Sequence, residues 1–408
     1  MPKKPHHPTH IAVVAPVSDP VFDAFAIASP GCAPLVADEL RALDVRLGDV
    51  SSAGVAFTAT TGVLLRVNLW SRLASRILVR LAEFTARDFA TLEKQAARVP
   101  WKTVVAPGAS VRFRVTCRKS RLYHSDAVAE RLARAVLKAV PSATIQAGAT
   151  RDDDDEASAS ATDTSFTQLI VVRFEHDRCT ISADTSGELL HRRGWRQAIA
   201  KAPLRETLAA AMLVACDWTG DVPLVDPFCG SGTIGIEAAL RARDMAPGLS
   251  RGFAIERWPG VDAGLMASLR DEARARIRPS VGVPIVMSDR DAGACDAARA
   301  NAARAGVTDD VQIMQQALSS VDIATLGSHG LVLSNPPYGL RISEGADLRS
   351  LYARLGDVIR AGGIGWRLGL LIPDRRLAAP ARLPFASVLQ TSNGGIGVRL
   401  EIASRNTE

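Results

Sequence analysis

The chain has 408 residues, is 47% hydrophobic and carries a formal net charge of +6. This length predicts two or three domains, and the charge suits a polyanionic partner without deciding on one. No apolar run approaches the length of a membrane span, and the start, MPKKPHHPTH, lacks the apolar segment of a secretory signal. The six cysteines include no C-x-x-C pair, so we expect a cytoplasmic protein with reduced thiols, no metal site and no membrane association.

The first half of the chain predicts an α+β region. Residues 1–21 are rich in proline and histidine, and we expect a disordered tail. Residues 22–80 alternate short strands and amphipathic helices, as in FDAFAIASPGCAPLVADELRAL, which favours a small module. Residues 81–186 predict a second module, with the strand ASVRFRVTC, a basic loop, a helix and a hairpin. The acidic, Ser/Ala-rich segment 151–164 predicts an exposed low-complexity loop within it.

The second half has a different pattern. Residues 187–203 have the composition of a basic linker. From 204 to 408, strands and helices alternate, as in VPLVDPFCGSGTIGIEAAL and VPIVMSDRDAGACDAARANAARAG. This alternation predicts an α/β fold with a doubly wound, Rossmann-like and mostly parallel sheet. Such sheets bind ligands at the carboxyl ends of their strands.

The stretch VDPFCGSGT has the features of a ligand-binding turn. Asp226 ends an apolar strand, and Gly230 and Gly232 would let the backbone turn sharply and approach a ligand closely. The helix that follows would point its N-terminus at that ligand. The stretch is neither a Walker A loop nor a full G-x-G-x-x-G. It predicts a phosphate or cofactor site, with a plain strand-to-helix turn as the alternative.

An acidic residue at the end of the next strand could bind a ribose diol. Asp289, in MSDRD, is our choice, and Asp291 is expected to lie at the N-terminus of the following helix. Glu256, in GFAIERW, is a rival, because it lies nearer the spacing of about 20 residues found in dinucleotide folds. We prefer Asp289 because its strand is more apolar and a helix follows directly.

The stretch LVLSNPPYGL ends a buried strand with an amide and an aromatic ring. Its two prolines cannot continue a β-ladder. An exocyclic amine on a base is a poor nucleophile, because its lone pair is delocalised into the ring. The Asn335 side-chain oxygen and the Pro336 carbonyl could each accept one amine hydrogen and aim the lone pair at a methyl donor. Tyr338 could stack on an unstacked base; the alternative is a strand-terminating turn.

DPFCGSG together with SNPPYG resembles the S-adenosyl-L-methionine-dependent amino-methyltransferases of the N-P-P-Y type. FAIASPGCAPLVADEL, GELLHRRGWRQ and APLRETLAAAML are similar to the THUMP-domain guanine-N2 RNA methyltransferases, above all to the amino-terminal half of the bacterial 23S ribosomal RNA enzyme. The resemblance implies a ferredoxin-like module at 22–80, an RNA-holding THUMP domain at 81–186 and a Rossmann-like catalytic domain at 204–408.

The resemblance also implies roles for individual residues. Asp226, Gly230 and Gly232 would contact the methionine part of the cofactor, and Asp289 its ribose hydroxyls. Thr207 would lie near the cofactor carboxylate.

Asn335, Pro336 and Tyr338 would contact the target guanine. Many relatives carry an Asp near the end of the third strand, where this chain has MQQALSS. Gln316 could accept a hydrogen bond from the adenine amine in its place.

We therefore expect methyl transfer to the N2 amine of a guanosine, in 23S ribosomal RNA or, as the alternative, in transfer RNA. A catalytically weak RNA-binding or assembly factor is the non-enzyme alternative. The basic linker and a basic stretch in the second module are expected to contact phosphates. That stretch comprises Arg112, Arg114, Arg118, Lys119 and Arg121. The second methyltransferase domain of the long bacterial enzyme has no counterpart here, and we expect its activity to be absent.

Overall fold

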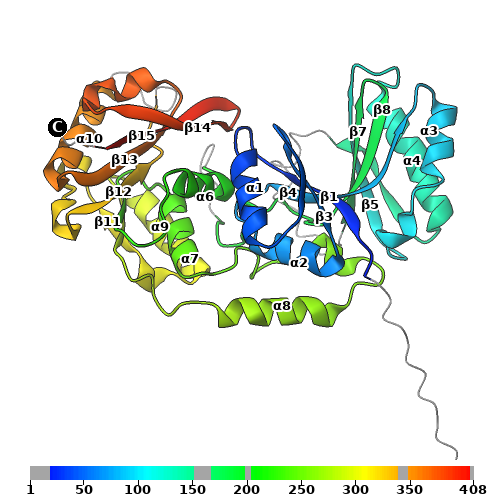
Figure 1. Cartoon of the computed structure of the whole chain (residues 1–408), viewed down its shortest axis with the longest axis horizontal. Helices are drawn as coiled ribbons and strands as arrows, with labels where there is room; N and C mark the ends of the chain where they lie inside the picture. The colour runs from blue at the N-terminus through cyan, green and yellow to red at the C-terminus, as the bar shows by residue number, and fades with distance from the viewer. Residues whose placement is uncertain (1–18, 151–166, 198–203, 339–347, 405–408) are drawn as a thin grey trace, which may run out of the picture.

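The computed structural model describes residues 19–150, 167–197, 204–338 and 348–404 (Figure 1). The predicted tail, apart from its last three residues, and the acidic loop 151–164 lie outside this part of the chain. Two sheets, each with its own helices, occupy opposite ends of the molecule, and helix α8 (Ala263–Ala275) runs along its lower edge in Figure 1.

The N-terminal half forms one eight-stranded sheet in the order β2-β3-β1-β4-β8-β7-β5-β6. Its elements are β1 (Phe22–Ile27), α1 (Ala33–Ala42), β2 (Leu47–Ser51), β3 (Gly54–Ala59), α2 (Thr61–Trp70), β4 (Arg76–Thr85), α3 (Phe89–Ala96), β5 (Ser110–Arg118), α4 (Ser125–Ala139), β6 (Thr144–Thr150), β7 (Thr167–Glu175) and β8 (Arg178–Asp184). Strand β4 crosses the predicted module boundary at residue 80 and pairs antiparallel with β1 and with β8. The two predicted modules therefore share a continuous sheet.

The C-terminal half forms a seven-stranded sheet in the order β11-β10-β9-β12-β13-β15-β14. Its elements are α6 (Glu206–Ala215), β9 (Leu224–Asp226), α7 (Thr233–Ala242), α8, β10 (Ile285–Asp289), α9 (Ala292–Ala305), β11 (Gln312–Gln315), β12 (His329–Ser334), α10 (Leu348–Gly362), β13 (Gly365–Ile372), the 3₁₀ segment η6 (Arg375–Ala381), β14 (Phe385–Asn393) and β15 (Ile396–Ser404). Strands β9 to β13 are parallel, whereas β15 runs antiparallel to β13 and β14. This confirms the doubly wound sheet expected from the sequence.

The strand order reverses between β9 and β12. From β9 the chain builds outward through β10 and β11, and it then returns to place β12 and β13 on the other side of β9. In doubly wound sheets this switch opens a crevice at the carboxyl ends of the two strands, because the loops after them lead away in opposite directions. Asp226 ends β9 and Ser334 ends β12, so the topology brings both to the crevice.

Basic residues of the linker join the two halves. Arg193 is only 3% exposed, pairs with Glu237 of α7 at 3.3 Å and donates to the carbonyl oxygen of Arg72 at 2.7 Å. Arg72 in turn donates to the carbonyl oxygen of Met245 at 2.5 Å. A buried, paired guanidinium cannot reach a phosphate, so the prediction of RNA contact is wrong for Arg193.

In the basic stretch around β5, the prediction of RNA contact is also wrong for one residue. Arg114 is only 7% exposed, so little of its side chain is accessible to a phosphate. Arg118, Lys119 and Arg121 are exposed, and their contact with RNA stays a prediction.

Candidate active site at the carboxyl edge of the C-terminal sheet

Asp226 is a buried carboxyl group at the switch between β9 and β12. Its Oδ1 accepts hydrogen bonds from the Ser334 hydroxyl at 2.6 Å and from the Phe228 N–H at 3.2 Å. Burial raises the pKa of Asp226 to about 7, the nearby Asp289 charge adds to this, and the two hydrogen bonds oppose it. The carboxyl therefore changes charge near neutral pH. Sequence reasoning missed Ser334, although a hydroxyl at the end of the apolar run LVLS was a usable signal.

The Gly-rich turn follows Asp226 and is fixed by backbone contacts. The Cys229 N–H donates to the carbonyl oxygen of Ser288 at 3.0 Å, and the Gly230 N–H donates to Asp289 Oδ2 at 3.1 Å. Gly230 and Gly232 have positive φ angles of 51° and 86°. A Cβ on Gly230 would meet none of the described residues within 4 Å, so this part of the chain leaves space for a ligand above the turn. The turn thus fits the predicted cofactor.

Substituting alanine for Gly230 or Gly232 should affect stability and ligand affinity differently. A Cβ on Gly232 would lie 3.1 Å from Ala298 Cβ, whereas one on Gly230 would enter the free space. Both substitutions carry the left-handed backbone cost of about 1–2 kcal/mol. We expect Gly232→Ala to lower the melting temperature more, and Gly230→Ala to lose more affinity for S-adenosylhomocysteine. Thermal unfolding and calorimetry on both variants test this, and equal losses in both measurements would contradict it.

Asp289 holds the turn and remains able to bind a ligand. Its Oδ2 accepts from Gly230 and its Oδ1 accepts from the Asp291 N–H at 3.1 Å. A carboxylate offers about four lone-pair positions, so ribose hydroxyls can bind beside these two N–H groups. The Gln316 N–H donates to the Asp289 carbonyl oxygen at 3.0 Å, which places Gln316 at the same edge, after β11.

The rival residue Glu256 does not lie at the end of a strand of this sheet. It belongs to the 3₁₀ segment η2 (Ala254–Arg257), where its side chain accepts the Phe253 N–H and pairs with Arg270 at 2.8 Å. Asp291 caps α9 by accepting the Ala294 N–H, as expected for an acid at a helix N-terminus.

Asn335 follows β12 directly and presents a buried acceptor. Its side-chain Oδ1 is buried and has no hydrogen-bond partner among the residues that the structure describes. Burying such an oxygen without a donor costs about 1–3 kcal/mol, and a ligand with an N–H group would remove this cost. Pro336 is buried next to it.

Tyr338 lies deeper than its predicted role requires. It is only 4% exposed, and the Asn393 side-chain amide donates to its hydroxyl at 3.4 Å. A base can stack on this ring only after the ring is uncovered, so stacking stays a prediction.

Arg196 connects the linker to the cofactor turn. Its guanidinium donates to the Thr233 hydroxyl at 2.5 Å and to the Leu204 carbonyl oxygen at 2.6 Å, and it pairs with Glu206 at 3.3 Å. Thr233 is the first residue of α7, so Arg196 holds the start of α6 beside the start of α7. Thr207 is buried in the first turn of α6, and its proximity to the cofactor stays a prediction.

Asn301 is a second anchor that sequence reasoning missed. Its side-chain amide donates to the Ser231 carbonyl oxygen of the turn at 2.9 Å, and its oxygen accepts from Arg304. Arg304 also donates to the Trp195 carbonyl oxygen of the linker at 2.7 Å. The available sequence signal was an asparagine in the alanine-rich stretch ARANAARAG, and the structure buries it fully.

Other classes of site are not apparent. In the described residues, no group of three or more His, Cys, Asp and Glu side chains could hold a metal ion. Within the same ranges, no helix has the length and apolar character to cross a membrane. The six cysteines are free thiols.

Residues 193–398 match the protein-family model described as "RMKL-like, methyltransferase domain". The chain belongs to this methyltransferase family. Residues 23–78 of the methyltransferase match the RlmL ferredoxin-like domain, which confirms the ferredoxin-like fold expected at the N-terminus.

Curated relatives agree with this assignment. "Putative RNA methyltransferase slr0064" of Synechocystis sp. is 32% identical over 374 residues, which are 91% of this chain and 94% of the relative. "Ribosomal RNA large subunit methyltransferase K/L" of Syntrophotalea carbinolica is 36% identical over 388 residues. That match covers 92% of this chain but 52% of the relative, so the methyltransferase spans about half the length of the K/L proteins.

A solved structure shares the whole fold. The crystal structure of SMU.472, "a putative methyltransferase complexed with SAH", is 28% identical with a TM-score of 0.82. The match covers 95% of the methyltransferase and 99% of that chain.

Proposed function

We propose that this methyltransferase methylates the exocyclic N2 amine of a guanosine in RNA, with 23S ribosomal RNA as the favoured substrate. The observation that carries the proposal is the buried Oδ1 of Asn335, which has no partner among the described residues and follows Ser334, the hydrogen-bond partner of Asp226. An acceptor without a donor, at the mouth of a cofactor crevice, suits a substrate that brings an amine hydrogen. The names of the relatives support RNA as the substrate class.

The cofactor is S-adenosyl-L-methionine, which supplies an electrophilic methyl group when bound. In our proposal the free space at Gly230 receives the methionine part, and the ionised Asp226 attracts its ammonium group. Asp289 accepts hydrogen bonds from the ribose hydroxyls, and Gln316 accepts one from the adenine amine. In this arrangement the Thr207 hydroxyl lies near the carboxylate of the cofactor's methionine part.

The chain's own residues then orient the amine. Asn335 Oδ1 accepts one N2 hydrogen and the Pro336 carbonyl oxygen accepts the other, which directs the nitrogen lone pair towards the methyl group. The bound cofactor would supply the methyl group and leave as S-adenosylhomocysteine, and the methylated amine, cationic and acidic, would release one proton to water. No strong base is required. Stacking on an uncovered Tyr338 would add about 1–3 kcal/mol to base binding.

Mass mapping of methylated guanines tests the proposal directly. Ribosomal and transfer RNA from cells with and without the gene for this protein would be compared. We expect one N2-methylguanosine to vanish from 23S RNA. A site lost only from transfer RNA would favour the alternative substrate, and an unchanged map would contradict the proposed activity.

Activity should also depend strongly on salt. Each phosphate contact contributes about −0.7 to −0.9 to the slope of log affinity against log salt concentration. With two or more contacts, kcat/KM on ribosomal RNA should fall about tenfold or more between about 50 and 200 mM salt. A flat response, with S-adenosylhomocysteine affinity as the control, would contradict a polyanionic substrate.

A further inference from the structure

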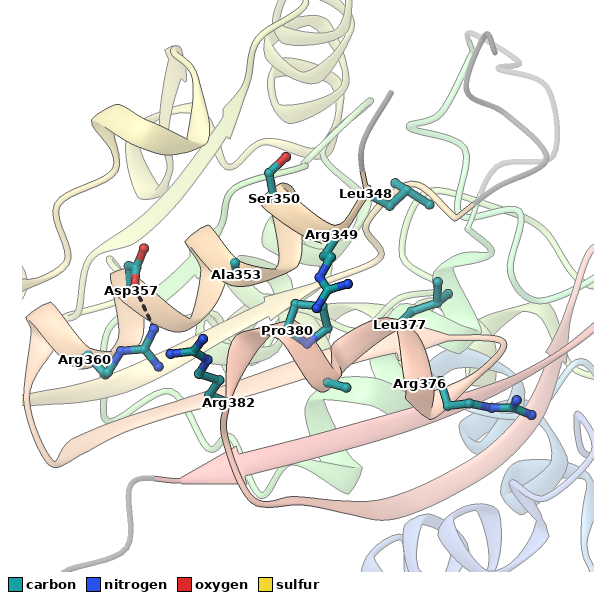
Figure 2. Close-up of a pocket in the computed structure, with 11 residues that line it drawn as sticks. Leu348, Arg349, Ser350, Ala353, Asp357, Arg360, Arg376, Leu377, Pro380 and Arg382 are labelled. Carbon is teal, nitrogen blue, oxygen red and sulfur yellow. Dashed lines mark hydrogen bonds and ion pairs between the residues drawn. The ribbon is translucent and has the colours of Figure 1, made fainter. Parts of the chain in front are cut away.

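We propose that a groove between α10 and η6 binds the phosphate backbone of the RNA strand that carries the target nucleotide. This inference rests on the proposed RNA substrate. The groove has a volume of about 810 Å³. Four arginines and one acidic residue, Asp357, are among its lining residues (Figure 2). The four are Arg349, Arg360, Arg376 and Arg382.

The groove starts at the catalytic edge of the sheet. Strands β12 and β13 are parallel neighbours, with Ser334 opposite Leu370. Because η6 begins at Arg375, just after β13 ends at Ile372, it starts at the edge where Asn335 lies. Helix α10 follows β12 in the chain, so it starts at this edge too and runs along η6. No predicted cofactor or base contact lines the groove, which makes it a separate, adjoining surface.

Among its lining residues, the groove has four arginines and one acidic side chain, Asp357. Asp357 Oδ1 accepts from Arg360 at 2.6 Å, and Arg360 also donates to the Ala381 carbonyl oxygen at 2.9 Å. Arg376 pairs with Asp374 at 3.3 Å, but its side chain is 93% exposed and such pairs are weak. In Figure 2, Arg349 lies over Pro380, in the middle of the groove, between the other arginines.

Guanidinium groups recognise phosphates by paired, charge-assisted hydrogen bonds. A chain of arginines leading away from the catalytic edge therefore matches a nucleic-acid strand whose target base enters at that edge. An acidic protein could also bind these arginines, but its binding would not require a groove that begins beside Asn335.

Arg382 extends the row of arginines past the C-terminal end of η6. Its φ angle is 53°, in the left-handed region that favours glycine. This conformation is common for a residue that ends a helix, and it places Arg382 at the C-terminal end of η6. In Figure 2 its guanidinium points into the same end of the groove as that of Arg360.

The test uses Arg382→Gly, Arg376→Ala and the double variant of the full chain. Arg274→Ala is the matched control, because Arg274 lies on α8 with a 58% exposed side chain paired to Asp271. Binding of 23S RNA transcribed in vitro would be measured by fluorescence anisotropy over a salt series. Melting temperatures and S-adenosylhomocysteine affinities would be measured on the same proteins.

We expect each groove variant to bind the RNA about three- to tenfold more weakly at low salt. The slope of log affinity against log salt should become less negative by about 0.7–0.9 for each arginine removed. Arg382→Gly should melt no earlier than the wild type, since glycine suits its backbone, and Arg274→Ala should match the wild type throughout.

Three outcomes would overturn the inference. If the double variant binds RNA with the affinity and salt slope of the wild type, the groove does not bind RNA. The proposed function would still stand if the wild-type protein methylates RNA. A wild-type protein that neither binds nor methylates RNA would overturn both. In the third outcome, the wild type is retained on immobilised polyglutamate while the double variant is not. If the double variant also binds RNA as the wild type does, the groove would be assigned to an acidic protein.

Discussion

Replacing Asn335 by alanine is expected to slow methyl transfer by about a hundredfold or more while cofactor binding persists. Removing one preorganised polar group that acts on the transition state typically costs about 10²–10³ in kcat. The variant also loses a buried oxygen that has no partner among the described residues. Its melting temperature should therefore stay the same or rise. Single-turnover methylation of ribosomal RNA, calorimetry with S-adenosylhomocysteine and thermal unfolding measure the three effects.

Asn335→Asp is the matched control for this prediction. Aspartate keeps acceptor oxygens at the same position, so we expect it to retain more transfer than alanine. An alanine variant with a near wild-type rate would show that the amide does not orient the amine. An alanine variant that no longer binds S-adenosylhomocysteine would assign Asn335 to the cofactor instead.

Local sequence patterns predicted the elements of the C-terminal half well. Apolar runs bounded by glycine, proline or acidic residues set the strands, and Asp226 and Asp289 do end β9 and β10. The preference for Asp289 over Glu256 rested on the apolar strand before it, and the structure places only Asp289 at the sheet edge.

Contacts between distant residues could not be predicted in this way. Ser334 donates to Asp226 across 108 positions in the chain, and only the strand order makes them neighbours. Arg193 lies in a basic segment typical of phosphate binding, yet it pairs with Glu237 and donates to backbone carbonyls of residues 71–72 and of Leu190. Composition gives the charge of a segment, whereas burial depends on what packs against it. Tyr338 shows the same limit, because its cover comes from β14 and the surrounding core.

The affinity for S-adenosylhomocysteine is expected to fall as the pH drops below about 7. Burial raises the pKa of Asp226 in the free protein to about 7, so at lower pH its carboxyl is mostly neutral. In our proposal the ammonium group of the ligand binds the ionised form. Binding at low pH must then release a proton, and the affinity should fall by up to about tenfold per pH unit. Calorimetry between about pH 5.5 and 8 measures this.

The stability of the free protein should show the opposite trend. The folded-state pKa of Asp226 lies above its unfolded value of about 3.9. Its contribution to stability is therefore fully present below about pH 4 and is lost as the pH rises through about 7. Asp226→Asn, which cannot ionise, should remove this part of both pH dependences and bind the ligand more weakly at pH 8.

Comparing the two proteins with the same ligand cancels any titration of the ligand itself. Equal pH profiles for the wild type and Asp226→Asn would mean that the carboxyl of Asp226 does not titrate on binding. The space at Gly230 could still receive the cofactor, but the charge that selects its methionine end would have to come from another residue. A Ser334→Ala variant tests in a second way whether Asp226 titrates when the ligand binds. Loss of its hydrogen bond to Asp226 should move the midpoint of the profile to higher pH, because that bond lowers the pKa.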